Sequence, residues 1–186
     1  EGIDKFLWRE GDKVRAAFGV NVDKSSEGML AELFVLGTYE RSKKHQLVNG
    51  SLTRVIRHDL NGSRSLHYQA GKHLQRPLKD RLFETWNIWS NVKMGKGGAT
   101  YILGIVPLQL YNGASFEDIG KEGFVVAEST GVYFIDEIAP NVCRVTRIQT
   151  VDLKFTGLLQ KTLMDKAIDY LAKNQLFNEA DRLQEK

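Results

Sequence analysis

The chain has 186 residues, of which 42% are hydrophobic and 26% are charged, an ordinary balance for a globular protein with one packed core. Its formal net charge of +3 is too small to indicate a nucleic-acid-binding surface, and no apolar run predicts a membrane-spanning helix. The single cysteine, Cys143, excludes an internal disulfide and fits a reducing compartment, so we expect a cytoplasmic protein. No signal-peptide pattern opens the chain, and it begins at Glu1 without Met, from which we expect a processed chain or an excised domain of a larger polypeptide.

The N-terminal part predicts a strand followed by two helices. Residues 2–10 are expected to form a short helix or a packed arm that presents large apolar side chains. Residues Lys13–Val22 alternate between apolar and polar side chains, which predicts a strand. The segment from Ser25 to Lys44 starts with N-cap residues and is helical in character, and we expect Gly37 to divide it into two helices.

The dipeptide Asn61-Gly62 is the clearest local signal in the chain. It lies between the segments Leu52–Leu60 and Ser63–Ala70, and Asn-Gly is the preferred dipeptide of a two-residue type I′ hairpin. A turn of this type fixes which residues of the two strands lie opposite each other, and therefore which side chains share a face.

The predicted register places Arg57 opposite Leu66 and Val55 opposite Tyr68, on the face that we expect to point inward. Glu84 lies on the next strand and is assigned to the same face. Because a buried guanidinium needs a partner, we hypothesise a buried pair of Arg57 and Glu84 that neutralises itself or anchors a ligand hydroxyl or phosphate. The alternative is a bulged strand that leaves both side chains in solvent.

The remaining strands are separated by two longer connections, 93–98 and 107–122. Apolar residues and lysines in these connections make them candidate gates that could touch a membrane surface, or ordinary loops that pack their own apolar side chains. The predicted strands are Asp80–Asn91, Ala99–Val106, Gly123–Ala127, Val132–Ile138 and 141–154.

Residues 158–175 predict one long amphipathic helix with a wide apolar face. A face of this width needs a broad apolar partner, and the preceding strands are the only candidate in the sequence. We therefore predict an α+β fold with a curved antiparallel β-sheet wrapped around a long C-terminal α-helix. We expect a single domain over 1–186, with its core at about 10–175 and a C-terminal helical extension at 176–186.

Three motifs in this order resemble those of a START (steroidogenic acute regulatory-related lipid-transfer) domain of the helix-grip class. The motifs are Pro77–Phe83 before a strand, Gly123–Val126 at the start of another, and Cys143–Gly157 leading into the last helix. Some positions differ from the family pattern: Leu82 replaces an acidic residue, and Gln160 stands where the family has proline. The resemblance therefore indicates a divergent member with a reshaped or reduced cavity.

The resemblance implies a non-enzymatic domain that binds or transfers one lipid or other hydrophobic ligand between the sheet and the last helix, as a carrier or a sensor. Its expected partners are that ligand, a transiently contacted membrane and other domains of a parent protein, with no nucleic acid and no cofactor. The residues expected to line the cavity are mostly apolar with a few polar anchors. They are Val55, Arg57, Leu66, Tyr68, Glu84, Trp86, Ile88, Tyr101, Leu103, Tyr133, Leu163 and Ala167.

Two alternatives stay open at this point. The chain could be a START-like interaction or regulatory module of a larger protein, with little or no cavity. It could also be a cyclase or hydrolase of the helix-grip class, but the sequence shows no recognisable acid–base constellation. The four histidines lack zinc-site spacing, although His58 and His67 could share a face, and Cys143 reads as a small buried hydrophobe.

Overall fold

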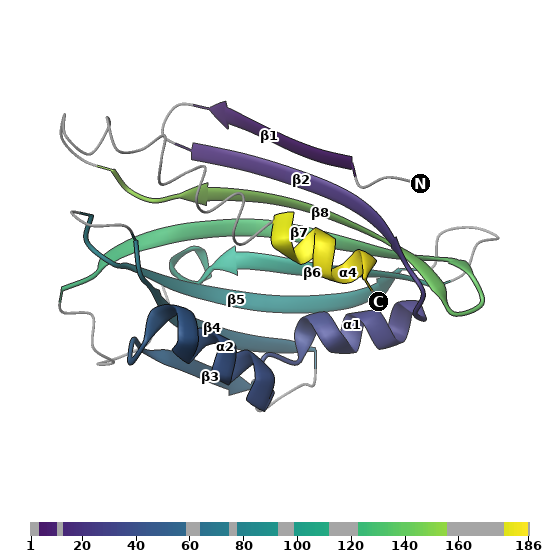
Figure 1. The fold of residues 1–186 in the computed structure, drawn as a ribbon, viewed down its shortest axis with the longest axis horizontal. Coiled ribbons are helices and arrows are strands. Elements are labelled where there is room, and N and C mark those ends of the chain that lie inside the picture. The colour runs from purple at the N-terminus through teal and green to yellow at the C-terminus, as the bar shows by residue number, and fades with distance from the viewer. Residues whose placement is uncertain are drawn as a thin grey trace.

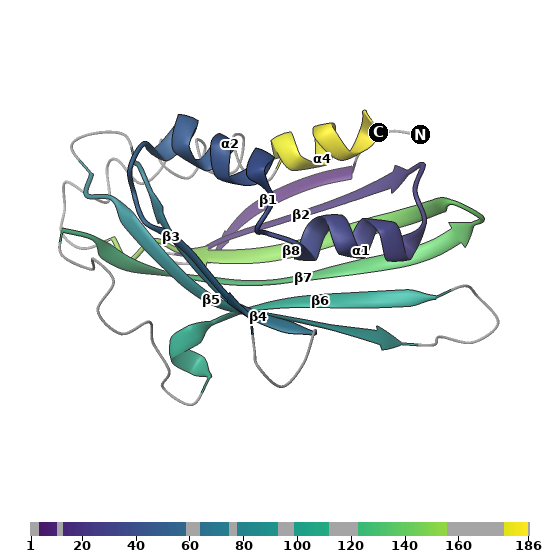
Figure 2. The same cartoon turned by 90° about the horizontal axis from the view of Figure 1, so that it is seen from below.

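The computed structural model describes residues 4–10, 13–58, 64–74, 78–92, 99–111, 123–155 and 177–185. Over these residues the chain forms one sheet of eight strands with its α-helices on one side (Figures 1 and 2). The predicted α+β architecture with an antiparallel sheet is confirmed. The strands are β1 (Asp4–Glu10), β2 (Lys13–Val22), β3 (Arg54–His58), β4 (Ser65–Lys72), β5 (Arg81–Val92), β6 (Thr100–Pro107), β7 (Val125–Ala139) and β8 (Val142–Asp152). The helices are α1 (Ser26–Phe34), α2 (Tyr39–Asn49), the short 3-10 helix η1 (Leu108–Leu110) and α4 (Asn178–Gln184).

The strands lie in the order β1-β2-β8-β7-β6-β5-β4-β3, and each pairs antiparallel with its neighbours. Strand β6 ends at Pro107, and beyond its end β5 and β7 meet and pair in parallel, with Arg81 opposite Val125. Strand β7 is continuous from Val125 to Ala139, whereas the sequence predicted two strands there. The strand is continuous because β8 pairs with it from Glu128 to Ala139. The backbone between the two predicted strands is therefore hydrogen-bonded to β8 as well.

The first strand corrects the prediction of a short helix or arm at residues 2–10. Asp4–Glu10 pairs with β2 along its whole length, from Asp4 opposite Gly19 to Glu10 opposite Lys13. Only two residues separate β1 from β2, a connection short enough for a β-hairpin. The same connection is too short for a helix at residues 2–10 to fold back onto the sheet. The isolated segment was also too short for a helix to be stable by itself.

The two predicted helices and the break between them are confirmed. Helix α1 is capped by Ser25, whose hydroxyl accepts a hydrogen bond from the Gly28 amide at 3.2 Å. Helix α2 is capped by Thr38, whose hydroxyl accepts from the Arg41 amide at 3.3 Å. The long helix predicted at 158–175, with Leu163 and Ala167, lies outside the described residues.

The main core lies between the sheet and helices α1 and α4. We call this side of the sheet the helix-covered face and the opposite side the outer face (Figure 2). Among the described residues, no helix is long and apolar enough to cross a membrane. The buried residues of the main core are Phe18, Val20, Val22, Met29, Leu30, Leu33, Phe34, Leu66, Leu103, Tyr133, Ile135, Cys143, Val145, Ala180 and Leu183.

Candidate functional site

Five of the twelve predicted ligand-contacting residues share the helix-covered face. They come from three strands, β4, β6 and β7, and the registers place Leu103 of β6 opposite Tyr133 of β7 and Tyr101 opposite Ile135. All five pack in or against the main core. They are Leu66, Tyr68, Tyr101, Leu103 and Tyr133.

Another five of the twelve lie on the outer face, so the predicted inward position is wrong for them. The observed register of β3 and β4 places Arg57 opposite His67 and His58 opposite Leu66, one residue away from the prediction. Since side chains alternate across a strand, this shift moves every side chain of β3 to the other face. The five residues are Val55, Arg57, Glu84, Trp86 and Ile88.

The predicted hairpin register is wrong, and the predicted turn at Asn61-Gly62 itself lies outside the described residues. A two-residue turn leaves an even number of residues between any two paired positions, whereas seven residues separate His58 from Leu66. The pairing of β4 with β5 fixes β4 independently, with Leu66 opposite Asn87 and Tyr68 opposite Thr85. The buried partners on β4 and β5 therefore decided the register, and the local turn preference did not.

The hypothesised buried pair of Arg57 and Glu84 changes accordingly. Arg57 is exposed on the outer face, so the expectation of a buried guanidinium is wrong. Glu84 is buried with 1% of its surface exposed, and its carboxylate accepts hydrogen bonds from Gln69 at 3.1 Å and Gln109 at 2.9 Å. The stacked rings of Trp86 and Tyr111, 4.1 Å apart, lie on this same face.

The helix-covered face carries a polar network that the sequence reasoning missed. Arg147 of β8 is opposite Tyr133 and donates to the carboxylate of Glu179 on α4, and its guanidinium lies 4.8 Å over the Tyr133 ring. The Tyr133 hydroxyl also donates to Glu179, at 3.1 and 3.3 Å to the two oxygens. Arg147 donates further to Gln149, whose amide donates to Ser129 at 2.6 Å. The network thus joins β7, β8 and α4.

One sequence signal would have located Arg147. It shares the parity of Cys143 and Val145, two buried residues of the same strand, and therefore had to point toward the helices. Glu179 had no comparable signal, because it lies far along the chain in a short helix with polar neighbours. Burial lowers the pKa of Arg147 and raises the pKa of Tyr133, so the tyrosine stays a neutral donor.

Further arginines surround this network. The charges of Arg41 on α2 and of Arg182 on α4 act on Tyr133, and both lower its pKa against the larger effect of burial. The pKa of Arg41 is lowered first by burial and then by the nearby charge of Arg182. Closer to β4, Arg54 lies 5.6 Å from the Tyr68 ring, and burial raises the pKa of Tyr68. The helix-covered face is therefore apolar with a cationic centre.

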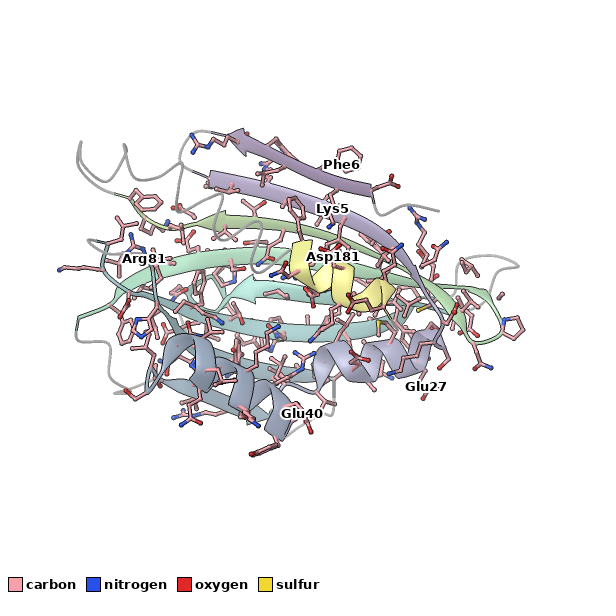
Figure 3. All side chains as sticks on the ribbon, in the orientation of Figure 1. Lys5, Phe6, Glu27, Glu40, Arg81 and Asp181 are labelled. Atoms are coloured by element: carbon pink, nitrogen blue, oxygen red, sulfur yellow. The ribbon has the colours of Figure 1, made fainter. Side chains whose placement is uncertain are left out.

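Helix α4 is held against the sheet at both of its sides. Ala180 and Leu183 are fully buried in the main core. On the other side, Lys5 of β1 bonds Asp181 at 2.6 Å and lies 5.6 Å from the Phe177 ring (Figure 3). The edge strand that the sequence did not predict therefore positions the helix that carries Glu179.

The three motifs that carried the resemblance meet at a second, smaller core cluster, which consists of Val14, Leu74, Leu78, Ala127, Leu153 and Phe155. Arg81 pairs with Val125, and its Nε donates to the Leu153 carbonyl at 2.6 Å. Arg81, which Figure 3 labels, is 1% exposed and lies 5.2 Å from the Phe155 ring. These contacts join the start of β5 to the end of β8, so the shared motifs fix the framework rather than the network at Arg147.

Metal and nucleophile chemistry find little support in the described part of the chain. No group of three or more histidine, cysteine, aspartate or glutamate side chains lies there that could hold a metal ion. Cys143 is fully buried, and burial raises the pKa of its thiol to about 11. A thiol of this kind stays protonated and inert, as expected of a small buried hydrophobe.

Comparisons of the sequence with models of known families and with curated proteins give no match. Solved structures do match the fold. The human StarD13 (DLC2) lipid transfer and protein localization domain has a TM-score of 0.61 at 16% identity, over 99% of this chain and 82% of that chain. Human STARD10 has a TM-score of 0.61 at 18% identity, over 95% of this chain and 71% of that chain.

Human StAR-related lipid transfer protein 5 has a TM-score of 0.62 at 12% identity, over 97% of this chain and 86% of that chain. Identities this low establish the fold and leave function to be argued from the site. The likeness that the three motifs predicted is confirmed at that level, and the chain has the helix-grip fold of START domains.

Proposed function

We propose that this chain binds one lipid or other hydrophobic ligand between the helix-covered face and the helices, as a non-enzymatic carrier or sensor. The fold is shared with domains whose names state lipid transfer, which makes this face the first place to look. The proposal rests on one observation: aromatic side chains that point toward the helices are only partly buried. Tyr68 is desolvated enough to raise its pKa, yet part of its surface is still accessible.

Trp89, Tyr101 and Ile105 are also only partly buried, although they point toward the helices and pack against the core. Partial accessibility of inward apolar side chains supports room for a ligand, because a solidly packed interior would bury them fully. Asn87 adds a polar anchor on this face. Its side-chain oxygen is buried and accepts no hydrogen bond from the described residues.

The test is a pair of neighbouring substitutions on β6, with Ile105 on the helix-covered face and Val106 on the outer face. Ile105→Trp fills the proposed ligand space, while Val106→Trp adds the same bulk on the opposite side. Native mass spectrometry of each protein after incubation with a lipid extract measures the retained lipid. Lipid retained by the wild type and by Val106→Trp, and lost from Ile105→Trp, supports the proposal. A wild type that stays empty in every extract contradicts it.

A second candidate is an interaction or regulatory module of a larger protein. It is favoured by the edge strand β1, where Phe6 is 60% exposed and Trp8 is 42% exposed on the outer face (Figure 3 labels Phe6). Large exposed aromatic side chains of this kind often mark contact surfaces. An empty wild-type protein in the lipid experiment would favour this candidate over the carrier.

Membrane contact is a further part of the proposal. Leu110, which follows β6 in η1, is 71% exposed, and Tyr111 beside it is 37% exposed. These side chains could enter the surface of a bilayer during ligand exchange. Leu110→Glu should then slow transfer of lipid between vesicles without reducing the amount of lipid bound by the free protein. Of the predicted gates, 93–98 and the part of 107–122 after residue 111 lie outside the described residues.

A further inference from the structure

The polar network on the helix-covered face contains more positive charge than negative charge. Arg147, Arg41 and Arg182 all act on the Tyr133 hydroxyl, and Glu179 is the carboxylate that both Arg147 and Tyr133 contact directly. Glu32 also acts on Arg41, but its carboxylate is bound to Lys24 at 2.9 Å. Among the described residues, the carboxylates of Glu179 and Glu32 thus act on three guanidinium groups, and the Glu32 carboxylate is shared with Lys24.

Two of these guanidinium groups have hydrogen-bond donors left over. The Nε atoms of Arg147 and Arg182 are buried and meet no acceptor among the described residues. A buried charged donor without an acceptor costs free energy, so native structures rarely keep one without a reason. The two unused Nε donors and the excess of positive charge both indicate that this place binds a negatively charged hydrogen-bond acceptor.

Glu179 shows what kind of group fits this place. It presents two oxygens at the end of a short apolar stem, and these oxygens take hydrogen bonds from Tyr133 and from Arg147. An arginine fork and a tyrosine hydroxyl suit planar carboxylates and phosphates alike. Glu179 reaches the cluster from α4, the last described helix, so the carboxylate enters from the helix side of the core (Figure 1).

We propose that Arg41, Arg147, Arg182 and Tyr133 form a binding site for the anionic group of an amphipathic ligand, a carboxylate or a phosphate. Glu179 occupies this site in the ligand-free protein and competes with the ligand. The inference rests on the proposed function and names its substrate class: anionic single-chain or multi-chain lipids are preferred over neutral lipids of the same chain length.

The experiment compares three probes that each contain twelve carbon atoms: dodecanoate, dodecyl phosphate and dodecan-1-ol. Affinities are measured below the aggregation concentration by calorimetry on the full chain. The expected result is at least a tenfold preference for one or both anions over the alcohol, the size of one charge-assisted hydrogen bond. The two anionic probes distinguish carboxylate recognition from phosphate recognition, and either preference supports the site.

Variants assign the preference to this cluster. Arg147→Gln should abolish the preference for the anions over the alcohol. Arg144→Gln is the matched control, because Arg144 lies on the same strand with its side chain on the outer face. Glu179→Gln should raise the affinity for the anions about tenfold, since it removes the competing charge. The double variant Arg147→Gln, Glu179→Gln restores charge balance if Arg147→Gln alone fails to fold.

The outcomes separate this inference from the proposed function. If the alcohol binds as tightly as the anions, or if Arg144→Gln and Arg147→Gln reduce anion binding equally, the anion site is refuted and ligand binding stands. If none of the three probes binds, and lipid extracts also leave the protein empty, the proposed function itself fails. Unchanged anion affinity in Glu179→Gln would refute its role as a competitor.

Discussion

Replacing Arg81 by methionine tests how the framework beneath the site is held. Arg81 is 1% exposed, and it donates to the Leu153 carbonyl at 2.6 Å and to the Lys79 carbonyl. Methionine fills much of the same volume but donates nothing. Leu153 is also buried, so its carbonyl would lose the partner that the structure gives it, whereas Lys79 is exposed and its carbonyl can turn to water.

The magnitude follows from these partners. An orphaned buried carbonyl costs about 1–3 kcal/mol, and the lost contact with the Phe155 ring at 5.2 Å adds about 0.5–1 kcal/mol. Against this, the variant no longer keeps a desolvated guanidinium, whose burial already lowers its pKa. We expect a net loss of about 2 kcal/mol in the free energy of unfolding.

Urea denaturation monitored by tryptophan fluorescence measures this loss. Arg144→Met is the control, because the Arg144 side chain is 43% exposed and its ion pair with Asp4 spans 3.5 Å at the surface. The control should change the free energy of unfolding by less than about 0.5 kcal/mol. If Arg81→Met changes it as little as the control does, the buried bond to Leu153 does not hold β5 to β8.

Three further predictions follow from other parts of the chain. Arg57→Gln should leave lipid binding within about twofold of wild type and change stability by less than about 0.5 kcal/mol, because Arg57 is exposed on the outer face; a loss of binding would restore the hypothesis of an inward anchor. Leu103→Ala should lower the free energy of unfolding by about 3 kcal/mol in urea denaturation, since Leu103 is 2% exposed within the main core, and a value below about 1 kcal/mol would mean that the site is not packed. Cys143 should make stability fall as pH rises from about 9 toward 11, because its thiol stays protonated when folded and ionises once unfolded, so that the folded state binds more protons there; a stability curve in Cys143→Ala that is identical to the wild type's would refute this.

The alternation of side chains along β2, the caps of α1 and α2, and the break at Gly37 were all readable from the sequence, and the structure confirms them. The motifs around Arg81, Val125 and Leu153 indicated the fold, and the structure brings them together, since Arg81 pairs with Val125 and donates to the Leu153 carbonyl. Such features are local or lie in short sequence motifs, so no knowledge of distant partners was required. That residues 1–186 form a single domain stays a prediction, as do the ligand contacts assigned to each residue.

Which face a strand presents to the core was decided only by the tertiary structure. The turn preference of Asn61-Gly62 predicted one register, but the pairing of Leu66 with Asn87 and the burial of both imposed another. Shifting the register by one residue changes the free energy of a turn only slightly. The same shift would expose every buried side chain of the strand, which costs far more free energy. The cluster of Arg147, Tyr133 and Glu179 has the same origin. Its members are distant in the chain, and only the packing of α4 on the sheet brings their charges together.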